Sequence, residues 1–265
     1  MVEQRERVVE TLDQASDQMQ GTYLGPAFSD EEIVEWLKHK GYRYEAMSPD
    51  KRAQQIAKLI ADQKVVGLFQ GRMEFGPRAL GNRSIIGDAR SPAMQSTLNL
   101  KIKYRESFRP FAPSCLEERI GDYFEIDRPS PYMLLVAQVK ADRCKAPEGD
   151  EIDLDEIQRV NRPRSDVPAI THVDYSARIQ SVSRKTNPQY WEIIKAFEDL
   201  TGYGIIINTS FNVRGEPIVC TPRDAYRCFM RTEMDYLVLG NLLLEKIKQP
   251  AWDQSDHWRE EFPQD

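Results

Sequence analysis

The chain has 265 residues, with 36 Lys and Arg against 42 Asp and Glu, and its net charge is −6. An acidic total argues against broad, charge-driven binding of nucleic acid or of a membrane surface. No apolar run approaches the roughly 20 residues of a membrane span, and the polar, acidic N-terminus is not a signal peptide. We therefore expect a cytoplasmic protein with no membrane partner.

The cysteines and histidines predict neither a disulfide framework nor a zinc site. None of the four cysteines forms a C-x-x-C pair, so reduced thiols are expected. The three histidines are far apart in the sequence, which does not fit the spacing of zinc ligands.

The predicted elements alternate between helices and strands along the chain. Residues 1–22 predict a helix or linker with a thin apolar stripe. Two capped helices follow, the first between Ser29 and Gly41, the second beginning at Ser48 or Asp50. Strands are then predicted at 65–70, 84–90, 132–139, 169–174, 177–182, 203–212 and 235–247, and helices at 92–104, 187–202 and 220–232.

This alternation favours an α/β fold with a mixed sheet. We expect a single large domain at 23–247, preceded by the helix or linker at 1–22 and followed by a tail at 248–265. Residues 140–167 are polar and lack periodicity, so they are interpreted as an insertion loop.

An arginine-rich loop follows the strand predicted at 65–70. From Arg72 to Arg109 there are eight basic side chains and three acidic ones, a local charge of +5 in an acidic chain. Arginine grips phosphate or carboxylate through two parallel hydrogen bonds, and glycines let the backbone approach a ligand. The loop therefore predicts an anion site, although separately solvated surface arginines are the alternative.

Two further stretches carry polar side chains at the ends of predicted strands. In IIINTSFNVRGEP, a β-branched strand runs into Asn208, Ser210 and Asn212, and ligands of open α/β sheets bind where strands end. A capped turn is the alternative. In HVDYSARIQSV, His172, Asp174 and Arg178 share one face if the stretch is extended. That stripe predicts an acid–base site, or else a solvated strand face. No Walker loop, G-x-G-x-x-G or G-x-S-x-G occurs.

Four stretches, in order, resemble the C-terminal half of the nodulation, cephamycin and tobramycin O-carbamoyltransferases: GRMEFGPRALGNRSIIGDAR, RESFRPFAPS, HVDYSARIQSV and NTSFNVRGEPIV. The resemblance runs from about Tyr23 to Lys246. It implies a YrdC-like domain, with a twisted mixed sheet flanked by helices. It also implies that carbamoyl phosphate reacts with ATP, used with Mg²⁺, to give carbamoyl adenylate and pyrophosphate with loss of phosphate.

The resemblance also implies site residues. It makes Arg78, Arg109 and Arg178 the catalytic candidates. The substrate- and nucleotide-binding set that it implies is Arg78, Arg83, Arg109, His172, Asp174, Arg178, Asn208, Ser210 and Asn212. No metal site is expected among them.

In that family a second, N-terminal actin-like half carries a metal site and passes the carbamoyl group to a hydroxyl. We expect such a half as a partner, in cis or as a separate subunit, because the scattered histidines here cannot supply its metal site. One alternative is a non-catalytic module that binds carbamoyl phosphate or a nucleotide and acts with a partner. Contact with RNA through the basic stretch is a further alternative, disfavoured because aromatic and basic residues do not interleave.

Overall fold

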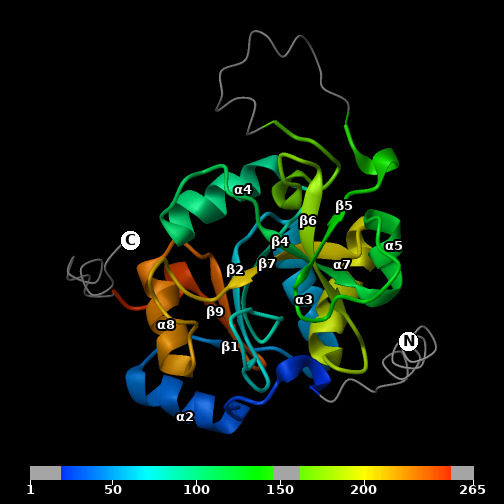
Figure 1. Ribbon diagram of the computed structural model, residues 1–265. Coiled ribbons are helices and arrows are strands. Elements are labelled where there is room, and N and C mark those ends of the chain that lie inside the picture. The colour runs from blue at the N-terminus through cyan, green and yellow to red at the C-terminus, as the bar shows by residue number, and fades with distance from the viewer. Residues whose placement is uncertain (1–18, 146–161, 252–265) are drawn as a thin grey trace.

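The computed structural model describes residues 19–145 and 162–251, and it contains a nine-stranded mixed sheet in the order β1-β9-β8-β2-β3-β7-β4-β6-β5 (Figure 1). The expected mixed α/β fold is confirmed. The strands are β1 (Glu45–Ala46), β2 (Val66–Phe69), β3 (Arg83–Gly87), β4 (Ala112–Leu116), β5 (Leu135–Gln138), β6 (Ser176–Val182), β7 (Ile205–Ser210), β8 (Tyr236–Leu239) and β9 (Leu242–Glu245). The helices are α2 (Asp30–Lys40), α3 (Pro49–Ala61), α4 (Pro92–Leu98), α5 (Ile120–Tyr123), α7 (Pro188–Thr201) and α8 (Pro222–Arg231).

Local signals in the sequence set the helix boundaries. Helix α2 begins with a capping box at Ser29 and ends at Gly41, whose φ of 69° suits glycine. Helix α8 begins with a capping box at Thr221, followed by Pro222 in the first turn. Helix α7 ends at Gly202 with φ 81°. These helices match the sequence-based expectations.

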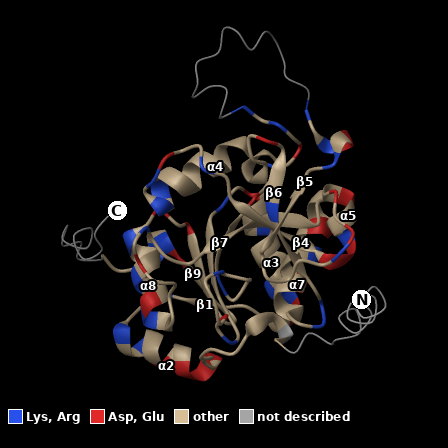
Figure 2. Cartoon of the chain, viewed as in Figure 1, with Lys and Arg blue, Asp and Glu red and all other residues tan. Residues whose placement is uncertain are grey.

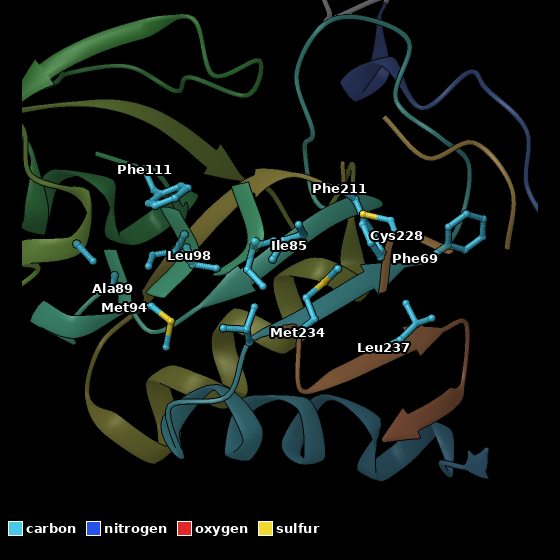
Figure 3. Packing of buried hydrophobic residues seen from close by; sticks show 14 of the residues in the cluster. Phe69, Ile85, Ala89, Met94, Leu98, Phe111, Phe211, Cys228, Met234 and Leu237 are labelled. Carbon is cyan, nitrogen blue, oxygen red and sulfur yellow. The ribbon is translucent and has the colours of Figure 1, made fainter. Parts of the chain in front are cut away.

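Helices cover both faces of the sheet. On one face Ile86 and Ile206 belong to an apolar cluster with Ile60 of α3 and Ile193 of α7. On the other face the cluster includes Ile85 and Ile207, together with Leu37 of α2, Leu98 of α4 and Phe229 of α8. Figure 3 shows part of this second cluster around Ile85 and Leu98. Alternate residues of a strand point to opposite faces, which explains the division.

The strand register gathers the polar loops at one end of the sheet. Phe69 at the end of β2 pairs with Arg83 at the start of β3, and Ser84 pairs with Ser210 at the end of β7. Ala112 at the start of β4 pairs with Asn208, and β6 runs parallel to β4. We call this place, where β2 and β7 end and β3, β4 and β6 begin, the polar end of the sheet.

The sequence-based predictions differ from the structure in several places. Residues 169–174 are not a strand, because Pro168–Ile170 form a 3₁₀ turn and a further turn precedes β6. The predicted helix at 92–104 is α4 followed by a π-helical turn, η2 (Asn99–Lys103). Strand β4 was not predicted, because Pro113 interrupts its apolar pattern.

The segments at the chain ends and within 140–167 are described only in part. The helix or linker predicted at 1–22 lies outside the described residues except for its last four positions. Within 140–167, a bridge between Cys144 and Ser165 joins the two described ends. Across the part of the chain that the structure describes, no helix has the length and apolar composition needed to cross a membrane.

Candidate anion-binding site

The arginine-rich loop between β2 and β3 is organised by the buried carboxylate of Glu74. Its Oε1 accepts hydrogen bonds from the backbone N–H groups of Leu80 and Asn82, both at 2.7 Å, and of Arg83 at 3.3 Å. Glu74 is only 5% exposed. A carboxylate that accepts several backbone N–H groups fixes the course of a loop without regular secondary structure.

The same loop is tied to the sheet by two buried amides. Asn208 Nδ2 donates to the carbonyl of Ala79 at 3.0 Å and to Gln180 Oε1 at 2.8 Å. Gln180 Nε2 in turn donates to the carbonyl of Leu80 at 2.9 Å. Asn208 Oδ1 is buried and has no hydrogen-bond partner within the described residues. The loop is therefore hydrogen-bonded to side chains of β6 and β7.

Arg78 of this loop lies within electrostatic range of Arg178 on β6. Burial and the Arg78 guanidinium both lower the pKa of Arg178. Arg78 is half-buried, and its Nε has no hydrogen-bond partner in the parts of the chain described. Two guanidiniums within electrostatic range of one another form a local positive potential, which an anion would neutralise.

His172 lies within electrostatic range of Arg178. Its pKa is lowered, chiefly by burial and also by Arg178, while Asp174 acts in the opposite direction. The lowered pKa favours the neutral imidazole, which can donate one hydrogen bond and accept another.

The expected extended stripe of His172, Asp174 and Arg178 is wrong in its geometry, because residues 172–175 form a turn. The N–H of Tyr175 donates to the carbonyl of His172 at 3.0 Å. Asp174 Oδ1 accepts from the N–H and hydroxyl of Ser176, at 3.1 and 2.7 Å. These bonds lower the pKa of Asp174 and define the start of β6. The turn nevertheless brings His172 close to Arg178.

Arg83 is placed differently from Arg78. It is fully buried, and its guanidinium lies 3.6 Å from the centre of the Phe69 ring. It donates to the carbonyls of Gln70 at 2.8 Å and Pro26 at 3.0 Å. Arg83 thus fixes the start of the arginine-rich loop from inside the protein.

Ser210 and Asn212 are held by a buried lysine. Lys103, in the π-helical turn η2, is 5% exposed. Its Nζ donates to the carbonyl of Ser210 at 2.5 Å, and to the carbonyl and Oδ1 of Asn212, both at 2.8 Å. The Ser210 hydroxyl donates to Asn212 Oδ1 at 2.7 Å. The strand-end loop is therefore rigidly positioned, and burial lowers the pKa of Lys103 to about 7.

Arg109 belongs to a second basic group. It forms an ion pair with Glu106, and its side chain is 54% exposed. Burial lowers the pKa of neighbouring Arg105 to about 10, with Arg109 and Arg214 acting in the same direction. Arg109 precedes β4 and so lies at the polar end of the sheet. Within the described chain, the Arg109 side chain pairs with Glu106 and not with a residue of the Arg78–Arg178 pair.

The structure therefore places these sequence-predicted residues in three arrangements at one end of the sheet. Arg78, Arg178 and His172 form the first, Lys103 with Ser210 and Asn212 the second, and the Arg105–Arg109–Arg214 group the third. Basic residues elsewhere are mixed with acidic ones, as on α2 and α8 (Figure 2).

Sequence reasoning missed Glu74, Gln180 and Lys103. Glu74 could have been found as the one acidic residue between Arg72 and Arg83. Gln180 shares the strand parity of Arg178. Nothing in the sequence marks Lys103, because its role depends on a π-helical turn that pairs with a distant loop.

Comparison with known proteins places these motifs in a family. A family profile described as "Carbamoyltransferase C-terminus" matches residues 57–246. This chain belongs to that family. The resemblance expected from the four motifs is confirmed.

Curated relatives of this carbamoyltransferase C-terminus domain match most of its length. It is 57% identical over 264 residues to an uncharacterized Synechocystis protein, sll1178, covering 99% of this chain and 42% of that protein. It is 39% identical to the nodulation protein NolO of Bradyrhizobium diazoefficiens, over 90% of this chain and 41% of NolO. It is 33% identical to the 3'-hydroxymethylcephem-O-carbamoyltransferase of Streptomyces clavuligerus, over 86% of this chain and 42% of that enzyme.

The domain thus spans less than half the length of these curated relatives. Among solved structures, full-length HypF in the phosphate- and nucleotide-bound form resembles it with a TM-score of 0.44 and 16% identity. That likeness covers 72% of this chain and 25% of HypF.

Proposed function

We propose that this domain binds carbamoyl phosphate and ATP at the polar end of the sheet and forms carbamoyl adenylate. The observation that supports the proposal most strongly is that Arg78, whose buried Nε has no hydrogen-bond partner in the described chain, lies within electrostatic range of Arg178. Both substrates are anions that repel one another, so a site that joins them needs fixed positive charge. Preorganised donors also stabilise the charge that develops during transfer.

We assign separate roles to the residues of the site. Arg78 and Arg178 bind phosphate oxygens through their guanidiniums, and His172 supplies a neutral hydrogen-bonding group. Asn208 positions the loop, and its unpartnered Oδ1 accepts a hydrogen bond from the carbamoyl NH₂ group. Ser210 and Asn212, held by Lys103, present the strand-end backbone to the ligand. Arg109 adds an exposed guanidinium at the edge of the site.

Arg83 and Asp174 act in this proposal as positioning residues. Arg83 fixes the loop that carries Arg78 through its bonds to backbone carbonyls. Asp174 fixes the turn that carries His172 through its bonds to Ser176. Neither side chain needs to touch a substrate to affect the reaction.

The reaction balances with one water molecule. Water and carbamoyl phosphate give carbamate and inorganic phosphate. A carbamate oxygen then attacks the α-phosphorus of ATP, and the bond to the β-phosphate oxygen breaks to release pyrophosphate. Among the described residues, no group of three or more His, Cys, Asp or Glu side chains is arranged to hold a metal ion. We propose that magnesium enters with ATP, bound mainly through phosphate oxygens.

We propose that a second polypeptide segment, outside this chain, transfers the carbamoyl group to an acceptor hydroxyl. The chain spans about two fifths of the relatives named above, so we propose an N-terminal actin-like half as partner, in cis or as a separate subunit. In this arrangement residues 23–247 form the adenylate-forming domain, 1–22 lead to the partner, and 248–265 are a tail. A reactive adenylate has to reach its acceptor without meeting bulk water.

The alternative is a module that binds carbamoyl phosphate or a nucleotide without turnover. One experiment separates the two. The chain is incubated with ATP, Mg²⁺ and carbamoyl phosphate, and carbamoyl adenylate and pyrophosphate are measured by mass spectrometry. Formation of both supports the enzyme. Saturable binding of both substrates without either product supports the module instead.

A further inference from the structure

An open pocket of about 280 Å³ lies beside the arginine-rich loop. Its wall is mostly apolar, and its lining includes Phe75, Pro77, Leu80, Tyr132 and Leu134. Phe75 is 70% exposed and Leu134 is 68% exposed. Large apolar side chains that line a pocket and yet face solvent are typical of ligand sites.

The pocket is joined to the anion site through one residue. Arg78 lines the pocket, and the same guanidinium lies within electrostatic range of Arg178. Its buried Nε has no hydrogen-bond partner in the described chain. A ligand in the pocket thus meets apolar surface on one side and unneutralised positive charge on the other.

This combination selects a ligand class. An apolar wall with an exposed aromatic ring suits a planar ring system, because base–aromatic stacking contributes about 1–3 kcal/mol. The adjoining arginines suit phosphate. The volume lies just below the roughly 300–1,000 Å³ of pockets for drug-sized ligands, so it fits one ring system rather than a whole nucleotide.

We propose that this pocket holds the base of a nucleotide whose phosphates lie on Arg78 and Arg178. The inference rests on the proposed function, since it takes ATP as the nucleotide. It adds Tyr132 and Leu134, which lie outside the resemblance motifs and precede β5, and it assigns Phe75, a residue of the first motif, as the stacking ring. Arg78 then lies between the base and the phosphates of the bound nucleotide.

The test compares two ligands that differ in the base. Affinities for ATP and for inorganic tripolyphosphate are measured by calorimetry on the full chain, for wild type, Phe75→Ala and Leu134→Ala. We expect ATP to bind more tightly than tripolyphosphate in wild type. Each variant is expected to weaken ATP binding at least fivefold and to change tripolyphosphate binding less than twofold.

Matched controls come from the same chain. Leu135→Ala changes the neighbouring residue of β5, 41% exposed, and Phe108→Ala removes a ring that is 45% exposed on the loop before β4. Neither lines the pocket, so both are expected to leave the ATP affinity unchanged. Melting temperatures verify that all four variants fold.

The outcomes separate this inference from the proposed function. If ATP binds and carbamoyl adenylate forms, but Phe75→Ala and Leu134→Ala behave like their controls, the pocket assignment is overturned and the function stands. Equal wild-type affinities for ATP and tripolyphosphate also overturn it. If no adenylate forms and ATP does not bind, the function and the inference both fail.

Discussion

Arg178 on β6 has a lowered pKa because it is partly buried and because the guanidinium of Arg78 lies nearby. The two residues come from distant motifs, and the loop that carries Arg78 is tied to β6 and β7 through Gln180 and Asn208. In the ligand-free domain the two positive charges repel one another. A bound anion removes that repulsion, so the pair links binding to stability.

Pyrophosphate is therefore expected to raise the melting temperature of the wild-type domain. The expected shift grows with ligand concentration, because a ligand that binds only the folded state stabilises it by RT ln(1 + [L]/Kd). Arg78→Ala is expected to lose most of the shift. The control is Arg72→Ala on the same loop, whose guanidinium bonds to the carbonyl of Leu24 at 2.9 Å. Equal shifts in the two variants would remove Arg78 from the site.

Gly81→Ala is expected to destabilise the domain by more than about 2 kcal/mol, measured by denaturant unfolding. Gly81 has φ +110°, and a Cβ there would lie 2.2 Å from the Tyr190 ring of α7. Strain and overpacking of this kind cost roughly 1–3 kcal/mol each. Gly76→Ala is the control, because Gly76 has φ +144° but no atom within 4 Å of the added Cβ. A cost for Gly81→Ala no larger than that for Gly76→Ala would contradict the packing argument.

Lys103 is expected to make stability depend on pH. The pKa of an unfolded lysine is about 10.4, and burial lowers that of Lys103 to about 7 in the folded chain. Between these values the unfolded chain binds more protons, so the contribution of Lys103 to the free energy of unfolding rises with pH. The groups that act on its charge are Cys228, Arg105 and Glu216.

The measurement is the free energy of unfolding of wild type minus that of Lys103→Met. We expect this difference to increase from pH 7 to pH 9.5. Burial also lowers the pKa of Lys246, to about 8, but that contribution is common to both proteins and cancels. A difference that stays flat would mean that the oxygens of Ser210 and Asn212 keep Lys103 charged throughout.

Arg109→Ala is expected to weaken the binding of carbamoyl phosphate by about 1.5 kcal/mol, the lower end of the range for a charge-assisted hydrogen bond. The lower end applies because the side chain is 54% exposed and pairs with Glu106. Arg109→Lys should restore part of the affinity, since a point charge does not replace a planar fork. Calorimetry that finds wild-type affinity in the alanine variant would remove Arg109 from the site.

Much of the fold could be predicted because the deciding signals are local. The capping boxes of α2 and α8 and the glycine after α7 lie within the helices' own sequences. Strand β7 follows from its β-branched run. The turn at 172–175 was mistaken for a strand because alternation of polar and apolar residues suits both. The hydrogen bonds from Ser176 to the Asp174 side chain stabilise the turn, and the alternation pattern does not reveal them.

The site could be predicted only as a set of motifs. The glycine-rich loop and the strand-end NTSFN stretch indicated an anion site, and the strand register brings them to the same end of the sheet. The different placements of Arg83 and Arg78 were not predictable, because the sequence pattern alone puts both arginines in the same loop, before the strand predicted at 84–90. Burial against Phe69 separates them.

The most direct test of the account is the carbamoyl phosphate-dependent release of pyrophosphate from ATP by Arg178→Ala, compared with Arg184→Ala. Arg184 follows the other end of β6, where its guanidinium lies 5.1 Å from the centre of the Trp191 ring. One charge-assisted bond contributes about 1.5–3 kcal/mol, so we expect Arg178→Ala to lose at least tenfold in rate and Arg184→Ala to retain the wild-type rate. Wild-type release by Arg178→Ala, or an equal loss in both variants, would contradict the placement of the reaction at the Arg78–Arg178 pair.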